Sequence, residues 1–408
     1  MPYSRVMESC AIMKRDRPIH IGVLFSKTGW TAATERSMLS ATKFAIDEIN
    51  EAGGINGRQL VPIYGDPEGK PAAYQDMARE LLSERKTSII LGCYTSSQRK
   101  AVLSVLDREH GLLCYPAQYE GFEYSRNIVY FGAVPNQNSF FLGSYLLENF
   151  TPRLYIVGSD YVWPRESGRI MADLISSRDG EIVGQRYLRE EASFEEFDAL
   201  IKDMKSRKPD IVFNNFVGNS NVKFYQAYAD NGLDAYQMPV ASLTTSETDI
   251  REIGVGAASG HITAATYFQS QTNAANRSCL ERYQAAHGEQ PNANMGWEAA
   301  YTQAHVVAQA MRRCDSDNVN LVRAQILGST FDAPQGVIAI DPLNSHAHVW
   351  PKIGVMREDG QFDIVAETSH AVPPDPYRAA YFLDDEDTPL RPPDLPKTLR
   401  ADSFGTQE

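Results

Sequence analysis

The sequence predicts an α/β fold made of two doubly wound parallel sheets, each with helices on both faces. Short apolar runs of strand length alternate with amphipathic segments of helix length from residue 19 onward. The same alternation begins again at residue 153, which indicates a second βαβ series. A chain of 408 residues is also too long for one simple core, so we expect two domains.

The first series consists of strands and helices in strict alternation. It opens with the apolar run IHIGVLF at 19–25, a strand. In the helix predicted at 37–54, Leu39, Phe44 and Ile49 lie near helical spacing, and glycines end it. The next elements are a strand at 58–66, a helix at 72–86, a strand at 87–93, a helix at 97–109 and a strand at 112–116. The segment IVYFGAVPNQ then reads as a connection leaving this unit.

The second series repeats the pattern, and the end of the chain departs from it. Its elements are a strand at 153–160, a helix from Pro164, a strand at 181–188, a helix at 194–207, a strand at 210–216, a helix at 221–232, and strands at 238–243 and 261–268. Helices follow within 275–328, and FDAPQGVIAI (331–340) predicts a strand. Residues 349–367 predict a hairpin with Asp359–Gly360 as its turn. After about Tyr381, acidic residues and prolines predict an extended or disordered tail.

Composition and charge narrow the function classes. The formal net charge of -13 argues against a direct grip on nucleic acid by the surface as a whole. No run approaches the eighteen or so apolar residues of a membrane helix. Five cysteines without a CxxC pair favour free thiols in a reducing compartment. The run Cys10–Met13 is too short for the core of a secretory signal, so the sequence predicts a cytoplasmic location.

Five loops carry the candidate site. Ligands of doubly wound sheets bind beyond the carboxyl ends of the strands, and the loops after five predicted strands are rich in small polar and aromatic residues. These loops are Tyr94–Ser97, Tyr115–Tyr119, Asp160–Pro164, Phe216–Ser220 and Thr244–Ser246. Ser96 or Ser97 is expected to cap the following helix, and Ser246 with Asp249 predicts a capping box.

The chemical character of these loops favours a small neutral polar ligand. Asp160 is the only formal charge within them, Arg165 and Glu247 directly follow two of the loops, and no lysine appears. An amino acid would require a carboxylate for its ammonium group, and a phosphate would require basic residues or a glycine-rich cradle. We therefore expect a ligand carbonyl over the free N–H groups of the helix that starts near Ser97.

Several stretches resemble one known family. GCYTSSQRKAVLSV, GLLCYPAQYEGFEYSRNIVYFGAVPNQNS, GSDYVWPRES, ASLTTSE and FDAPQG resemble the amide- and urea-binding branch of the type I periplasmic-binding-protein superfamily, over about residues 19–377. The resemblance implies two α/β lobes joined by three crossovers that close over the ligand. It places the N-terminal lobe at 18–134 plus 270–340 and the C-terminal lobe at 135–269 plus 341–380. Residues 1–17 are then an N-terminal extension and 381–408 a tail.

The resemblance also assigns individual roles in the pocket. Tyr94 and Tyr115 match aromatic walls, Ser96 matches the serine that holds the amide, and Tyr161 matches a hydroxyl from the opposite lobe. The predicted ligand-binding set is Tyr94, Ser96, Tyr115, Ala117, Gln118, Tyr161, Trp163, Val217 and Thr245.

Two members of this branch are near, a cytoplasmic amide sensor and the binding component of urea and short-chain-amide ABC transporters. Three of the positions depart from the amide sensor. Ala117 and Trp163 stand where the sensor has a threonine and a tyrosine, and Gln118 replaces a proline and matches the transporter members instead.

The resemblance implies a non-enzymatic, cytoplasmic sensor of small amides or urea. It would regulate amide- or nitrile-degrading enzymes through a protein partner, such as an RNA-binding antitermination regulator, and the chain itself is expected to be a homo-oligomer. The alternative is the substrate-binding component of a urea or short-chain-amide ABC transporter. An amide hydrolase is the less favoured class, because Ser97 and Lys100 form an S-x-x-K without accompanying motifs. We expect no metal or cofactor, since His346 and His348 have no further ligands nearby in sequence.

Overall fold

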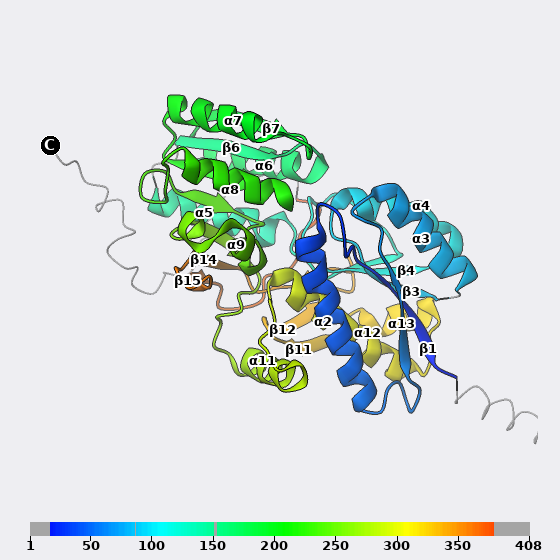
Figure 1. Ribbon diagram of the computed structural model, residues 1–408. Coiled ribbons are helices and arrows are strands. Elements are labelled where there is room, and N and C mark those ends of the chain that lie inside the picture. The colour runs from blue at the N-terminus through cyan, green and yellow to red at the C-terminus, as the bar shows by residue number, and fades with distance from the viewer. Residues whose placement is uncertain (1–16, 86, 151–152, 379–408) are drawn as a thin grey trace, which may run out of the picture.

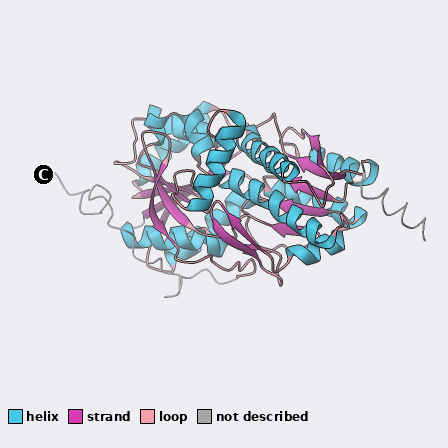
Figure 2. Ribbon diagram, turned by 90° about the horizontal axis from the view of Figure 1, so that it is seen from below, coloured by secondary structure: helices cyan, strands magenta, loops and turns pink. Residues whose placement is uncertain are grey.

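Two sheets with flanking helices form the framework of the molecule (Figure 1): the first is parallel, and the second is parallel except for its last two strands, which pair antiparallel, where the sequence predicted a parallel sheet. The computed structural model describes residues 17–85, 87–150 and 153–378. The predicted tail lies outside these ranges, as does the N-terminal extension apart from Arg17. The helices cover the sheets on both sides, as the view turned by 90° shows (Figure 2). The predicted α/β architecture of two sheets, each flanked by helices, is therefore confirmed.

The first sheet has five parallel strands in the order β2-β1-β3-β4-β5. Its strands are β1 (Ile19–Leu24), β2 (Leu60–Gly65), β3 (Ile89–Gly92), β4 (Leu112–Tyr115) and β5 (Ile128–Tyr130). The helices of this series are α2 (Ala32–Glu51), α3 (Pro71–Arg79) with a π-helical turn at Glu80–Glu84, and α4 (Ser96–Glu109). Strands β3, β4 and β5 are buried throughout, as expected for parallel strands covered on both faces.

The second sheet has seven strands in the order β15-β14-β10-β9-β8-β6-β7. Its strands are β6 (Arg153–Ser159), β7 (Glu181–Leu188), β8 (Ile211–Asn215), β9 (Val240–Ser242), β10 (Ile262–Ala265), β14 (Lys352–Met356) and β15 (Phe362–Glu367). Its helices are α5 (Ser139–Asn149), α6 (Val162–Ser176), α7 (Phe194–Arg207), α8 (Asn219–Asp230), α9 (Glu247–Ile253) and α10 (Val255–Ala258). The predicted hairpin is confirmed as β14 and β15, which pair antiparallel to each other around the turn that contains Gly360.

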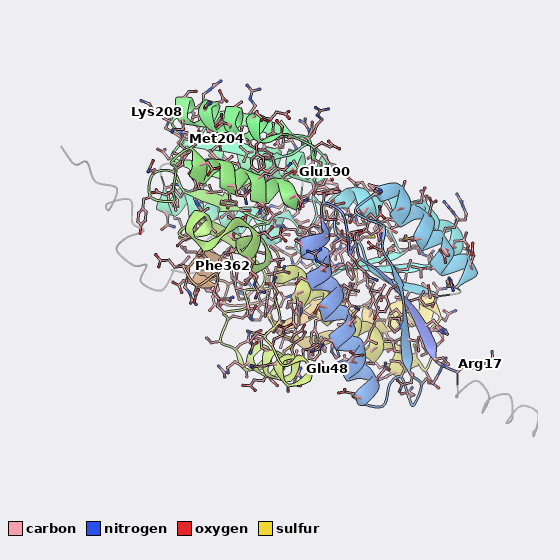
Figure 3. All side chains as sticks on the ribbon, viewed as in Figure 1. Arg17, Glu48, Glu190, Met204, Lys208 and Phe362 are labelled. Carbon is pink, nitrogen blue, oxygen red and sulfur yellow. The ribbon has the colours of Figure 1, made fainter. Side chains whose placement is uncertain are left out.

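Between β10 and β14 the chain returns to the first sheet. This returning segment holds α11 (Ala274–His287), α12 (Met295–Cys314), α13 (Val319–Ile326), β11 (Thr330–Ala333), β12 (Gly336–Ile340) and β13 (Ala347–His348). Glu48 of α2, marked in Figure 3, accepts hydrogen bonds from Arg282 (2.6 Å), Tyr301 (2.6 Å) and His305 (3.2 Å). These contacts join the returning helices to α2.

Strand pairing places residues 341–348 with the returning segment. β13 pairs with β12, and His346 forms a bridge with Tyr130 of β5. The single strand predicted at 331–340 is wrong, because β11 and β12 form a hairpin that turns at Pro334–Gln335. The lobe boundaries themselves stay a prediction.

Candidate ligand-binding cleft

Two adjoining compartments lie between the lobes. The first, here the tyrosine compartment, encloses about 240 Å³, part of it open to solvent. Its lining residues are Tyr94, Thr95, Ser96, Gln118, Tyr161, Trp163, Val217 and Thr244. Six of the nine predicted ligand-binding residues are in this set, and they come from loops of both lobes. The predicted site residues are therefore largely brought together, although their role in binding stays a prediction.

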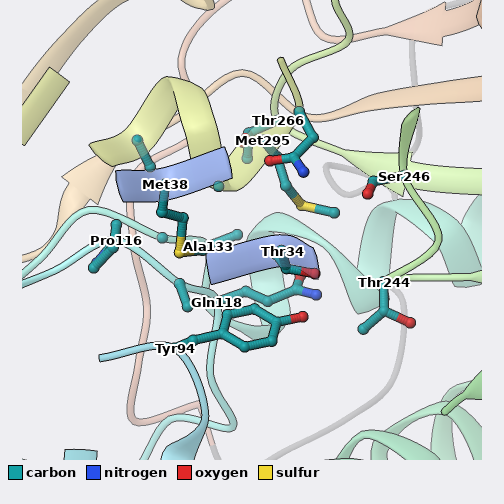
Figure 4. A pocket seen from close by; sticks show the side chains of 15 residues that line it. Thr34, Met38, Tyr94, Pro116, Gln118, Ala133, Thr244, Ser246, Thr266 and Met295 are labelled. Carbon is teal, nitrogen blue, oxygen red and sulfur yellow. The ribbon is translucent and has the colours of Figure 1, made fainter. Parts of the chain in front are cut away.

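The second, here the methionine compartment, encloses about 480 Å³, and this volume again includes space that is open to solvent. Its lining residues are Thr34, Met38, Tyr94, Pro116, Ala117, Gln118, Gly132, Ala133, Thr244, Ser246, Thr266, Asn294, Met295, Gly296 and Ala299. Figure 4 shows Met38 and Met295 on one side of this space and Tyr94 with Gln118 on the other. Tyr94, Gln118 and Thr244 line both compartments, so the two spaces adjoin.

Tyr94 is held by the turn that joins β3 to α4. Thr95 caps α4, and Gln98 completes a capping box by accepting the N–H groups of Tyr94 and Thr95, each at 2.8 Å. The other end of the Gln98 side chain donates to the buried carboxylate of Glu35 (3.2 Å). The prediction that Ser96 or Ser97 caps this helix is wrong, because Thr95 is the residue with extended backbone at its start and a side-chain bond to the N–H of Gln98.

The hydroxyl of Ser96 already has two partners. It donates to Glu120 (2.5 Å) and accepts from the guanidinium of Arg99 (3.2 Å). Arg99 is fully buried and also donates to Glu123 (2.7 Å). Although burial alone would raise it, the charge and hydrogen bonds of Arg99 hold the pKa of Glu123 below its ordinary value. Ser96 is thus the end of a buried ionic cluster that lines the cleft.

Two predicted contact residues lie behind the cleft wall. Tyr115 is fully buried and donates its hydroxyl to the backbone carbonyl of Tyr94 (2.6 Å). The guanidinium of Arg99 lies 4.8 Å from the centre of the Tyr115 ring and 4.4 Å from that of Tyr119. Thr245 is also fully buried, and its hydroxyl donates to that of Ser242 (3.0 Å). The structure does not bring Tyr115 and Thr245 into the lining, where they were expected.

The second lobe contributes aromatic rings from the start of α6. Tyr161 caps this helix, and its ring meets that of Trp30 edge-on at 6.3 Å between centres. Burial raises the pKa of Tyr161 well above its ordinary value, so the hydroxyl stays neutral and can donate and accept hydrogen bonds. Trp163 is buried beside it.

The lobes touch directly around the cleft, as expected of a closed clamshell. The N–H of Asn219 donates to the carbonyl of Trp30 (3.2 Å), and Gln118 donates to the carbonyl of Leu243 (2.5 Å). Gly218, at φ +58°, makes the first approach possible, since a Cβ there would lie 2.2 Å from the Trp30 carbonyl oxygen. The closed arrangement therefore rests on backbone and side-chain contacts from both lobes.

A family model described as a periplasmic binding protein domain matches residues 19–382. The chain belongs to the periplasmic binding protein family. Among solved structures, this binding protein is similar to an ABC transporter solute-binding protein from R. palustris in complex with 4-hydroxybenzoate, at 20% identity and a TM-score of 0.79, covering 87% of this chain and 98% of that one. At that identity the likeness shows the fold.

Two curated relatives match over shorter stretches. One is the Leu/Ile/Val-binding protein homolog 3 of Brucella melitensis, 24% identical over 48% of this chain and 53% of the relative. The other is named limonene hydroxylase, from Geobacillus stearothermophilus, 26% identical over 31% of this chain and 23% of the relative. The binding protein thus spans about half the length of these curated relatives or less. The amide-specific branch inferred from the motifs is not resolved by these matches.

The sequence reasoning missed several lining residues of the binding protein. Thr34 and Met38 lie in the first two turns of α2, which begins five residues before the helix predicted from residue 37. Asn294 and Met295 stand at the start of α12, in a segment read only as helical. Thr244 was in a predicted polar loop but was not selected. Pro-Asn-Ala-Asn at 291–294, directly before a long helix, was the available signal for Asn294 as a helix cap.

The described residues also show the surroundings of Lys100 and the distribution of possible metal ligands. Within the described ranges, no group of three or more His, Cys, Asp or Glu side chains could hold a metal ion. Lys100 pairs with Glu123 (3.2 Å) and Glu120 (3.5 Å), so its ammonium is held by carboxylates and is a poor base for Ser97. No helix of the described residues is long and apolar enough to cross a membrane.

Proposed function

We propose that this chain is the solute-binding component of an ABC transporter for a small neutral amide. One observation carries the ligand class: none of the described residues that line the two compartments has a charged side chain. The lining instead offers neutral hydroxyl and carboxamide groups beside aromatic rings. A neutral ligand loses less hydration free energy than an ion when the lobes close over it.

The start of α4 offers hydrogen bonds that suit an amide carbonyl. The first-turn N–H groups of a helix lack intrahelical partners, and the Thr95 side chain takes only that of Gln98. The N–H groups of Ser96 and Ser97 are then free to donate to a ligand oxygen. The ligand NH₂ group can donate to the hydroxyl of Tyr161 across the cleft, which gives contacts to both lobes and so favours closure.

The ligands named for related proteins are charged and fit this lining less well. An amino acid such as leucine carries an ammonium group, for which neither compartment offers a carboxylate. A benzoate also lacks a basic side chain here, since the guanidinium of Arg99 is buried between Glu120 and Glu123. The N–H groups at the start of α4 would favour an anion.

Titration of the purified protein distinguishes these ligand classes. Acetamide, urea, leucine and 4-hydroxybenzoate are added separately while tryptophan fluorescence is followed, with Trp163 as the reporter inside the tyrosine compartment. We expect saturable binding of the neutral amide, with a signal that a Trp163→Phe variant largely removes. Binding of leucine or 4-hydroxybenzoate without binding of any amide would contradict the proposal.

A cytoplasmic amide sensor is the second candidate, favoured by the GFEYS stretch at 121–125. It would act on a regulatory protein partner. The predicted homo-oligomeric state is compatible with both candidate functions. Cell fractionation separates the two candidates, because a transporter component is expected outside the cytoplasm and a sensor inside it. A partner protein whose affinity depends on saturating amide would favour the sensor.

A further inference from the structure

We propose that the ligand is an amide with an apolar substituent, which fills the methionine compartment while the amide group lies in the tyrosine compartment. This inference rests on the proposed function and names its ligand more closely. The two spaces share Tyr94, Gln118 and Thr244, so one molecule can span them. The methionine compartment is the larger of the two, at about 480 Å³ against about 240 Å³.

Apart from Thr266, the polar side chains around the methionine compartment are already hydrogen-bonded within the protein. Thr34 pairs with the hydroxyl of Tyr94, and Thr244 donates to the carbonyl of Phe216 (2.9 Å). Ser246 donates to Asp249 (2.6 Å), and Asn294 caps α12 while donating to Thr248 (2.5 Å). Groups that already have partners gain little from a polar ligand, so this space favours an apolar one.

The remaining wall is apolar and adaptable. It consists of Met38, Met295, Pro116, Ala117, Ala133 and Ala299, with the backbone of two glycines. The thioether side chains of Met38 and Met295 are unbranched and fill irregular space around ligands of different shape. In Figure 4 these two side chains come from different helices, and α2 and α12 pack against each other behind them. The compartment is therefore suited to an alkyl chain or a ring.

The carboxamide of Gln118 marks the boundary between the two compartments. Its NH₂ group donates to Leu243 (2.5 Å), and its oxygen accepts from Asn138 (2.9 Å). Both ends are thus engaged, and the side chain is fixed across the cleft. The amide group of a ligand then has its partners on the Ser96 side, and its substituent passes Gln118 toward Met295.

A homologous series of unbranched amides tests this assignment on the unmodified protein by calorimetric titration. From acetamide to hexanamide we expect the affinity to rise about fourfold for each methylene until the compartment is filled. Acetamide binding without any rise along the series would overturn this inference and leave the proposed function standing. Failure of every amide, acetamide included, would overturn both.

Two variants test whether the rise in affinity with chain length depends on this compartment. Ala133→Val narrows it, and we expect the affinity ratio of hexanamide to acetamide to fall about tenfold, since the added methyls displace about as many ligand carbons. Ala324→Val makes the same change at an exposed position of α13 outside both compartments, and it should keep the ratio within about twofold. Thermal unfolding of both variants checks that they fold. An unchanged ratio in a folded Ala133→Val variant would place the substituent elsewhere and overturn the proposal.

Discussion

The two walls of the cleft are supported in different ways. Behind the first-lobe wall, the buried guanidinium of Arg99 connects Ser96, Glu120 and Glu123. Behind the second-lobe wall lies a network of amides and hydroxyls with one carboxyl group, that of Asp249, and no basic side chain among the members named here. Its central member is Asn221, which accepts from Asn214 (2.8 Å) and donates to Thr245 and Asp249 at 3.3 and 3.2 Å; Ser242 and Thr263 extend it.

This difference predicts that the first wall is more rigid than the second. Buried ion pairs leave few alternative arrangements, because each misplaced charge would be unpaired in a medium of low dielectric constant. Neutral hydroxyls rotate at small cost and can re-pair. The first wall is therefore expected to keep its shape between the open and closed states, and the second to adjust to the ligand.

The largest effect is expected from removing the central charge of the first wall. Arg99→Met leaves two carboxylates buried with only Lys100 nearby, and we expect a loss of about 3–5 kcal/mol in the free energy of unfolding. Urea denaturation measures this. The matched control is Lys100→Met, which removes a charge from the same cluster at a side chain that is 44% exposed. It should cost at most about 1 kcal/mol. Equal losses in the two variants would contradict the distinction between the walls.

The two walls also respond in opposite directions to pH. Glu123 has a lowered pKa, so its stabilising contribution is lost as the pH falls below the ordinary value of 4.5. Burial raises the pKa of Glu247, beside Ser246 on the second wall, to about 8. The folded protein then keeps a proton that the unfolded chain releases between pH 4.5 and 8, and this costs stability as the pH rises.

Glu247→Gln isolates the contribution of Glu247 to the pH dependence of stability. Since the variant no longer titrates at this position, its stability relative to the unsubstituted protein should increase between pH 5 and 8, by up to about 1 kcal/mol for each pH unit. Denaturant unfolding at several pH values measures the difference. A difference that stays constant over this range would show that Glu247 titrates alike in the folded and unfolded states.

Local periodicity was enough to predict most of the fold. The helix Phe194–Arg207 matches its prediction residue for residue, because its apolar spacing and the Ser193–Glu196 capping box are both local signals. The strands of the returning segment were harder to predict from the sequence. The turn at Pro334–Gln335 interrupts a run of strand-forming residues, and only pairing between β11 and β12 shows that two strands are present.

The loops that form the candidate site could be predicted, because they directly follow strands. Which residues of these loops line the cleft and which are buried behind it could not. Tyr115 was expected in the lining because it ends β4 beside Ala117, but the fully buried Arg99 draws its ring behind the wall. Nothing in the local sequence indicates that Arg99 is buried, since arginine side chains are mostly exposed in folded proteins. The same holds for Thr245, which is buried while its neighbour Thr244 lines the cleft.

The smallest expected effect concerns the point where the two walls meet. Gly218→Ala places a Cβ 2.2 Å from the carbonyl oxygen of Trp30 in the closed state, and the lobes must separate to relieve it. We expect ligand affinity to fall about tenfold, which corresponds to about 1.4 kcal/mol. Titration with the amide that binds best measures this, and small-angle scattering should show a larger share of open molecules.

Gly232→Ala is the control that separates closure from backbone strain. Gly232 also has a positive φ, +72°, but a Cβ there meets nothing within 4 Å. Both variants place alanine at a positive φ and should lose stability for that reason, and only Gly218→Ala should also lose affinity. An equal loss of affinity in the two would mean that general destabilisation, and not the contact between Gly218 and Trp30, weakens binding. A loss confined to Gly218→Ala ties ligand binding to closure, because that contact joins the two lobes.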